Sequence, residues 1–336
     1  MPDPAVPALT PFRAAPGRKP THRDEPSGVE TLLGIDLGGT KSAAIVATPD
    51  GTLLHRVSAP TPAHGDGATL HAFLRGLALD VLEQTAASPV GCGISAGAPT
   101  DNATGTVFAA PNLPGWGAQG DPLAERLSAD LGGLPIRIEN DADATAMAEH
   151  RYGAGRGTRT MAFLTIGTGV GAGLVLGGKL HRGMRGAGGE IGHIAVVPRG
   201  GRTCPCGLRG CLEAYASGPS VVRVAIERGY QGDPTGAAVA AAARAGDPAA
   251  SHAFRQAAEM LGRGLATLTM LLNPERIVLG TLAVHAGDLL IDPIRRTISR
   301  RVWARLDEGL TVVPAALGDR AQDLAALCAW LGPGAP

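Results

Sequence analysis

Apolar and polar residues follow the same order in two separate parts of this chain, and that order predicts two similar α/β units. Residues 31–60 predict three strands, joined by a glycine-rich turn at 38–41 and a Pro-Asp-Gly turn at 49–51. Residues 160–180 repeat the beginning of this design as a strand, a Gly-Thr-Gly turn and a second strand. An internal repeat of this kind indicates two similarly built lobes with a ligand held between them.

Helical spacing of apolar residues dominates the rest of the chain. We expect helices over 68–85, 121–130, 219–229, 235–245, 248–272, 288–305 and 321–330, and short strands over 90–95, 136–138, 276–280 and 310–314. A further helix begins directly behind 136–138, so Asn140 and Asp141 stand at a strand-to-helix corner. Asp143 follows within the first turn, where a carboxylate is expected to stabilise the helix dipole.

Length and charge limit the classes of function. A chain of 336 residues suits two domains of ordinary size. Residues 1–29 contain seven prolines and little apolar periodicity, which predicts a disordered tail. The formal net charge is zero, so we expect a small-molecule partner and neither nucleic acid nor a membrane surface. We also find no apolar run long enough for a transmembrane helix and no signal peptide.

Residues 188–213 predict a zinc site. The segment contains four candidate ligands: His193, Cys204, Cys206 and Cys211. Three thiolates and one imidazole make the closed tetrahedral shell of a structural zinc ion. Isolated cysteines are more often small buried hydrophobes, but only one residue separates Cys204 from Cys206, too few for an easy disulfide. Clustered thiols that must stay reduced indicate a cytoplasmic protein.

Two carboxylates flank the predicted metal loop, Glu190 before its histidine and Glu213 after its last cysteine. A plain zinc knuckle does not require them. Their presence indicates a rigid clamp for a polar ligand.

The two glycine-rich hairpins are candidate phosphate-binding loops. Their backbone N–H groups could close on a phosphate, Thr40 could add a hydroxyl donor, and Asp36 could hold Mg²⁺ through water. Because the first turn joins two strands, it is not a Walker loop, which would open a helix. One glycine-rich hairpin is more often just a turn, but two of them, each opening half of the chain, are a more specific signal.

Three further positions are candidates with a simpler alternative. Asn112 lies in the Pro- and Gly-rich loop 109–117, where it could face a ligand or merely cap a turn. Asp141 is either a helix N-cap or a presented catalytic group. Gly280 ends a strand at a place where backbone can meet a ligand.

Six separated motifs resemble the ROK family of sugar kinases and repressors, in particular its zinc-containing glucokinases. They are DLGGTK at 36–41, PNLPGW at 111–116, ENDAD at 139–143, TIGTGVGAG at 165–173, GGEIGH at 188–193 and CPCGLRGCLE at 204–213. The resemblance covers residues 31–332 in the family's order. It implies an actin/hexokinase-like (ribonuclease H-like) α/β fold with two lobes and a central cleft, assembled as a homodimer or homotetramer.

The same resemblance implies how the chain is divided. We expect an N-terminal small lobe over 30–139 and a C-terminal large lobe over 140–318, which contains the zinc loop 188–213. A C-terminal helix within 319–336 is expected to return to the small lobe.

The implied activity is ATP-dependent phosphorylation of glucose at its 6-hydroxyl, with Mg²⁺ and Zn²⁺ as metals. Asp141 matches the family's general base and also contacts the sugar. The other matching sugar contacts are Asn112, Asn140, Glu190, His193 and Glu213. The matching nucleotide contacts are Asp36, Gly38, Gly39, Thr40, Lys41, Thr168, Gly169 and Gly280.

Two departures from the family pattern lie on the nucleotide side. Thr281-Leu282-Ala283 follows Gly280 where further glycines are usual, and the last helix lacks the usual Gly-Ala pair. Alternatives stay open: a kinase for N-acetylmannosamine, N-acetylglucosamine, fructose or allose, or polyphosphate in place of ATP. A sugar-responsive repressor is disfavoured by the zero net charge and by the absence of a winged-helix pattern before residue 31.

Overall fold

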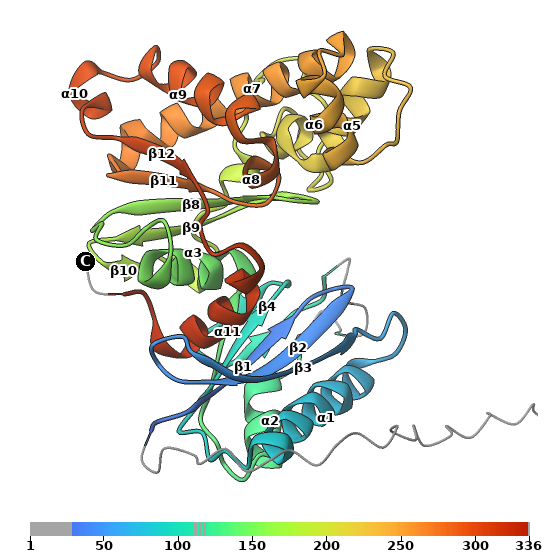
Figure 1. The fold of residues 1–336 in the computed structure, drawn as a ribbon, viewed down its shortest axis with the longest axis vertical. Coiled ribbons are helices and arrows are strands. Elements are labelled where there is room, and N and C mark those ends of the chain that lie inside the picture. The colour runs from blue at the N-terminus through green and yellow to red at the C-terminus, as the bar shows by residue number, and fades with distance from the viewer. Residues whose placement is uncertain (1–28, 111–112, 114–115, 117–118, 335–336) are drawn as a thin grey trace, which may run out of the picture.

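The computed structural model describes residues 29–110, 113, 116 and 119–334. Its strands form two five-stranded sheets and a small ribbon (Figure 1). The N-terminal sheet has the order β3-β2-β1-β4-β7, with bounds β1 Leu32–Leu37, β2 Lys41–Ala47, β3 Leu53–Pro60, β4 Cys92–Ala96 and β7 Ile136–Asn140. The C-terminal sheet has the order β10-β9-β8-β11-β12, with bounds β8 Met161–Ile166, β9 Val170–Leu176, β10 Lys179–Leu180, β11 Arg276–Leu279 and β12 Thr311–Pro314. The ribbon pairs β5 (Thr100–Asp101) with β6 (Thr106–Val107).

The helices form three layers around these sheets (Figure 1). Their bounds are α1 Gly67–Thr85, α2 Leu123–Asp130, α3 Asp141–Tyr152, α4 Glu213–Ala216, α5 Gly218–Glu227, α6 Gly236–Arg244, α7 Pro248–Leu272, α8 Leu282–Ala286, α9 Ile291–Ser299, α10 Ala304–Asp307 and α11 Ala321–Leu331. Short 3-10 turns are η1 Met184–Gly186, η2 Ile191–His193, η3 Gly287–Leu289 and η4 Gly318–Arg320. Helices α1 and α2 cover the outer face of the N-terminal sheet, α5 to α9 lie beyond the C-terminal sheet, and α3 and α11 lie between the sheets.

Both sheets have the same topology, which confirms the repeat predicted from the sequence. In each sheet the first three strands are antiparallel neighbours. The fourth strand pairs in parallel with the first, and the fifth pairs in parallel with the fourth. The α/β architecture expected from the sequence is therefore confirmed.

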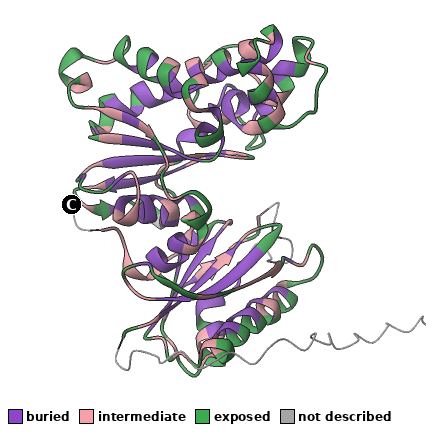
Figure 2. Cartoon of the chain, in the orientation of Figure 1, coloured by how far each residue is buried: buried purple, intermediate pink, exposed green. Residues whose placement is uncertain are grey.

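Strand β1 is apolar throughout because helices cover both of its faces. Side chains alternate across a strand, so Leu33 and Ile35 pack with Leu74 of α1, whereas Leu32 packs with Leu327 of α11. Figure 2 shows the same pattern over the whole molecule, with buried strands and exposed outer helix faces. Each fully buried leucine stabilises the fold by about 1.5–3 kcal/mol.

Glycine in β4 lets the last helix approach the sheet closely. A Cβ atom at Gly93 would lie 2.0 Å from the carbonyl oxygen of Ala326 and 2.8 Å from the backbone nitrogen of Trp330. Both atoms belong to the backbone of α11 and cannot rotate away. Any larger residue at position 93 must therefore displace α11 from the N-terminal sheet.

A buried glutamate fastens the segment between β12 and α11. The side chain of Glu149 in α3 has no exposed surface. Its carboxylate accepts hydrogen bonds from the amides of Ala154 at 2.7 Å, Ala316 at 3.0 Å and Leu317 at 3.1 Å. These charge-assisted bonds satisfy the buried charge and hold α3 against the chain leading to α11.

Most predicted elements are found at closely similar bounds, but one helix prediction is wrong. The helix expected over 288–305 is divided into η3, α9 and α10. Pro293 lacks an N–H group and fits only the first turn of a helix, so α9 begins at Ile291. Helix α8, which has five residues and follows Gly280 closely, was not predicted from the sequence.

Two expectations concern the ends of the chain and membranes. The predicted tail, 1–29, lies outside the described residues except for its last position. In the described part of the chain, no helix combines the length and the apolar content that crossing a bilayer would require.

Candidate active site

A cavity of about 490 Å³ lies between the carboxyl end of β4, the start of α3 and the C-terminal hairpin loop. We call it the polar cavity. Its lining includes five of the six predicted sugar contacts, namely Asn140, Asp141, Glu190, His193 and Glu213, and the loop Gly167–Gly169 with the predicted nucleotide contacts Thr168 and Gly169. The structure thus brings together residues that are far apart in the sequence. Asn112 lies outside the described residues.

Asn140, not Asp141, is the N-cap of α3. The side-chain Oδ1 of Asn140 accepts from the amide of Ala142 at 2.9 Å, and its Nδ2 donates to the carbonyl of Ala98 at 3.3 Å. Asp141 Oδ1 also accepts from the Ala142 amide, at 2.8 Å, which leaves Oδ2 without a partner among the described residues. Asp141 is exposed to solvent, yet the protein atoms around it in the cavity partly desolvate its carboxyl and raise its pKa above the usual range.

The four predicted metal ligands converge at one side of the polar cavity. The ligand atoms of His193, Cys204, Cys206 and Cys211 all lie within 4.8 Å of one another. The Cys204 Sγ to His193 Nδ1 distance is 3.6 Å, and the Cys206 Sγ to Cys211 Sγ distance is 3.8 Å. Tetrahedral zinc with Zn–S bonds of about 2.3 Å and Zn–N bonds of about 2.0–2.1 Å requires ligand atoms about 3.5–3.8 Å apart. Two pairs already have this spacing, and all four ligand atoms lie close enough together to converge on one zinc ion.

The flanking carboxylates connect this cluster with the rest of the cavity. Glu213 Oε1 lies 3.7 Å from Cys204 Sγ, while Glu213 Oε2 accepts from the amide of Val170 at 2.9 Å. Glu190 Oε2 lies 3.8 Å from His193 Nε2, the ring nitrogen that faces away from the cysteines. The cavity thus presents acceptors and an imidazole in fixed positions, which suits a ligand made of hydroxyl groups.

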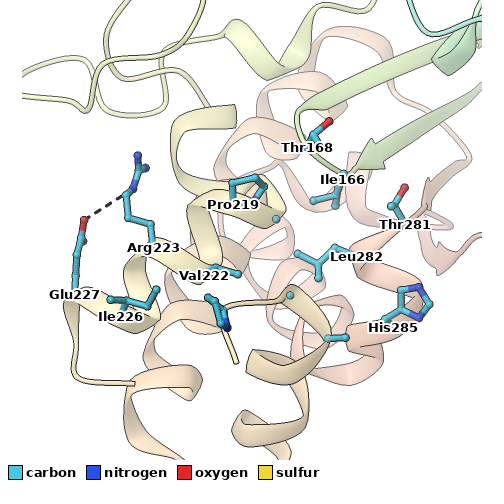
Figure 3. Close-up of a pocket in the computed structure, with 15 residues that line it drawn as sticks. Ile166, Thr168, Pro219, Val222, Arg223, Ile226, Glu227, Thr281, Leu282 and His285 are labelled. Atoms are coloured by element: carbon cyan, nitrogen blue, oxygen red, sulfur yellow. Dashed lines mark ion pairs between the residues drawn. The ribbon is translucent and has the colours of Figure 1, made fainter. Parts of the chain in front are cut away.

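A second cavity, of about 690 Å³, adjoins the first across the loop Gly167–Gly169. We call it the apolar cavity (Figure 3). Its walls are largely aliphatic side chains of β8, α5 and α8: Ile166, Pro219, Val222, Ile226 and Leu282. Figure 3 shows Thr168 and Thr281 on one side and the Arg223–Glu227 ion pair on the other. A volume in this range with apolar walls suits a heteroaromatic ring.

Gly167 and Thr168 line both cavities, so the C-terminal hairpin forms the wall between them. The amide of Gly167 donates to the carbonyl of Gly169 at 2.9 Å, which closes the turn. The amide of Gly218 donates to the carbonyl of Gly167 at 2.8 Å, which ties the turn to α5. Any ligand that reaches from one cavity into the other must pass this loop.

The N-terminal hairpin is placed differently, because Gly38, Gly39, Thr40 and Lys41 line neither cavity. The carbonyl of Gly38 accepts from Thr61 Oγ1 at 2.7 Å, whereas Gly39, Thr40 and Lys41 are exposed. The hairpin is connected to the polar cavity through the amide of Gly97, which donates to the carbonyl of Leu37 at 3.0 Å.

Asp36 lies at the end of β1, near Asp141. Burial, together with the negative charges of Asp323 and Asp141, raises the pKa of Asp36 to about 7, and Arg56 opposes this effect. Arg56 Nε is 3.0 Å from Asp323 Oδ1, so its positive charge mainly neutralises Asp323 and acts less on Asp36. A divalent cation between Asp36 and a phosphate would relieve the remaining repulsion.

Sequence reasoning missed a buried charged group beside the polar cavity. Glu139 accepts from Arg182 Nε at 2.9 Å and from Asn102 Nδ2 at 2.6 Å. Asp143 is 4% exposed and lines the cavity, and its Oδ1 has no hydrogen-bond partner among the described residues. Burial and the charge of Glu139 raise the pKa of Asp143 to about 7. The expectation that Asp143 simply stabilises the helix dipole is therefore incomplete.

The Glu139–Arg182 contact joins the end of β7 to the loop that leads into Glu190. The two partners are 43 residues apart in the chain, so no local pattern could reveal the pair.

Gly280 also differs from expectation. It is buried against Phe163 and lines neither cavity, whereas Thr281 and Leu282 line the apolar cavity.

Comparison with known proteins matches this chain to one family over nearly its whole described length. The model of the "ROK family" matches residues 32–331. Glucokinase of Streptomyces coelicolor is 36% identical over 310 residues, covering 86% of this chain and 94% of that protein. The ROK hexokinase structure from Thermus thermophilus superposes with a TM-score of 0.77 at 36% identity, covering 90% of this chain and 98% of that one. A Streptomyces griseus ROK glucokinase in complex with glucose and AMPPNP gives 0.71 at 35% identity, covering 88% and 98%.

Proposed function

Because the chain belongs to the ROK family, we propose that it is a glucokinase, which transfers the terminal phosphoryl group of ATP to the 6-hydroxyl of glucose. Its two-sheet architecture is the actin/hexokinase-like fold of ROK sugar kinases. We take the functional lobes as 30–139 and 140–318, with α11 packed on the N-terminal sheet.

One observation carries the proposal: two cavities of opposite character share the wall formed by Gly167 and Thr168. The polar cavity suits a hexose, and the apolar cavity suits a nucleobase. A triphosphate chain reaching from the base toward the sugar would lie along this wall. Phosphoryl transfer depends mainly on such positioning and on charge neutralisation.

Asp141 is the proposed general base. Its Oδ1 is occupied by the Ala142 amide, so Oδ2 is the oxygen available to accept the proton of the 6-hydroxyl. Partial desolvation by the surrounding protein raises the pKa of its carboxyl, which makes the carboxylate a stronger base. Asn140 fixes the backbone at this corner by capping α3.

Sugar recognition is assigned to Asn112, Asn140, Asp141, Glu190, His193 and Glu213. Acceptors fixed on different loops can each pair with a particular hydroxyl, and an epimer would leave one of them unpaired. Glu213 is held by the Val170 amide, and His193 lies against Cys204, another of the proposed zinc ligands. Both are therefore positioned before the sugar binds.

Three cofactors are proposed. Zinc would be held by His193 and the three cysteines in a four-coordinate structural site without an open position, which would orient the imidazole. Mg²⁺, which neutralises phosphate charge when bound, would be held near Asp36. ATP would meet the protein at Gly38–Lys41, Thr168, Gly169 and the chain behind Gly280. We further propose a cytoplasmic homodimer or homotetramer, in line with the family resemblance.

A panel of sugars tests the function. Phosphorylation of glucose, mannose, fructose, N-acetylglucosamine and N-acetylmannosamine is measured with ATP and Mg²⁺ in a coupled assay. We expect the highest kcat/KM for glucose. A higher kcat/KM for an N-acetylhexosamine would assign the alternative substrate, and no turnover of any sugar would refute the kinase proposal.

A further inference from the structure

Thr281 has a backbone conformation that threonine normally avoids. Its φ is +52° and its ψ is −109°. Ala86 and Asn273 also have positive φ among the described residues, but both are ordinary left-handed C-caps of helices. The ψ of Thr281 lies outside that left-handed region, in backbone space used almost only by glycine. A β-branched residue held there by its surroundings indicates a functional constraint.

The side chain of Thr281 makes one hydrogen bond, which crosses the wall between the two cavities. Its Oγ1 lies 2.9 Å from Thr165 Oγ1. Thr281 lines the apolar cavity and Thr165 lines the polar cavity. The methyl group of Thr281 faces Gly167, because it lies 3.7 Å from the position that a Cβ of Gly167 would occupy. The two hydroxyls therefore lie beside the loop that both cavities share.

Proton counting leaves one donor free at this position. Each hydroxyl carries one proton, and the bond between Thr165 and Thr281 uses one of the two. Neither hydroxyl has another hydrogen-bond partner among the described residues. One O–H group therefore remains for a ligand oxygen at the junction of the cavities.

We propose that Thr281 binds the phosphate chain of the phosphoryl donor, with its hydroxyl oriented by Thr165. This inference rests on the proposed kinase function and adds a residue to it. Where glycines would offer only backbone groups, Thr281 offers a side-chain donor. The ligand is the phosphate chain itself, whether it belongs to a nucleoside triphosphate or to inorganic polyphosphate.

Binding without sugar tests the proposal on the full chain. Affinities of AMPPNP, tripolyphosphate and adenosine are measured by calorimetry with Mg²⁺ for wild type, Thr281→Val, Thr281→Ser and Thr165→Val. We expect Thr281→Val to weaken AMPPNP about tenfold or more, the usual effect of losing a hydrogen bond to a charged group. Thr281→Ser should stay within about threefold of wild type, and adenosine should bind equally to all variants.

Two further measurements separate this role from a structural one. Thr165→Val combined with Thr281→Val should cost little more than Thr281→Val alone, because Thr165 acts only by orienting the Thr281 hydroxyl. Thr281→Gly should raise Tm, since glycine fits the backbone, and yet weaken AMPPNP binding. Thr267→Val, an exposed threonine of α7, is the matched control and should change neither quantity.

Clear outcomes would overturn the inference. Unchanged AMPPNP affinity in Thr281→Val would do so, as would an equal loss for adenosine, because the contact would then be to the nucleoside or to the pocket shape. A parallel loss for tripolyphosphate would support the phosphate contact, whereas unchanged tripolyphosphate affinity in Thr281→Val would count against it. Since no measurement involves sugar turnover, failure to phosphorylate glucose would refute the proposed function separately.

Discussion

The polar and apolar cavities share a wall but recognise ligands by different physics. The polar cavity offers carboxylates, an amide and an imidazole on rigid loops, whereas the apolar cavity offers aliphatic walls from α5 and α8. Hydrogen bonds are directional and penalise a mismatched partner, but apolar burial is roughly proportional to area and tolerates substitution. We therefore expect strict selection of the sugar and weak selection of the nucleobase.

The largest expected effect concerns Asp141, the proposed general base in the polar cavity. Asp141→Asn keeps the shape of the side chain but removes its capacity to accept a proton. We expect kcat to fall by about 10²-fold or more, while the Kd for glucose, measured by calorimetry, stays close to wild type. Turnover within a few-fold of wild type would show that another group is the base.

The next largest effect is expected from removing the metal, which should weaken binding in the polar cavity and leave the apolar cavity unchanged. Metal analysis should find one zinc per chain, and chelation should raise the KM for glucose about tenfold, since His193 loses its fixed position while Glu213 keeps its bond to the Val170 amide. AMPPNP affinity should change little, because the apolar cavity contains none of the four ligands. Metal-free protein with unchanged glucose KM would contradict the assignment.

Donor selectivity tests the apolar cavity. Thr281 and Leu282 stand where further glycines are usual and both line this cavity, so we expect fewer backbone contacts to the adenosine. Ala283 is fully buried and does not line the cavity. Each lost adenosine hydrogen bond costs about 0.5–1.5 kcal/mol, or roughly a factor of two to ten. We expect similar kcat/KM for ATP and GTP and a raised KM for ATP at saturating glucose. Strong preference for ATP with a micromolar KM would overturn this.

The smallest expected effect is on stability. Burial raises the pKa of Asp143 from 3.8 to about 7, so the native state binds more protons than the unfolded state between these values. The contribution of Asp143 to the free energy of unfolding is therefore lost as pH rises from about 4 to 7. Asp143→Asn should raise Tm by a few °C at pH 8 and by less at pH 5. An equal shift of Tm at both pH values in Asp143→Asn would exclude the titration.

Sequence reasoning succeeded where the determining contacts are local. The hairpins and the cysteine cluster depend on residues close in the chain, so their patterns predicted both correctly. The pairs Glu139–Arg182 and Thr165–Thr281 are 43 and 116 residues apart, and no periodicity reports contacts of that kind. Asp143 was misjudged for the same reason, because its burial depends on how α3 packs against β9.

The packing of α11 on the N-terminal sheet has a consequence for synthesis on the ribosome. Leu32 and Ile45 bury one face of that sheet against α11, the last helix of the chain. Roughly 180 residues separate β7 from α11, and at about 5–20 residues per second their translation takes on the order of 10 s or more. During that interval the apolar face lacks the cover of α11, so a nascent chain stalled before α11 should bind chaperones or aggregate.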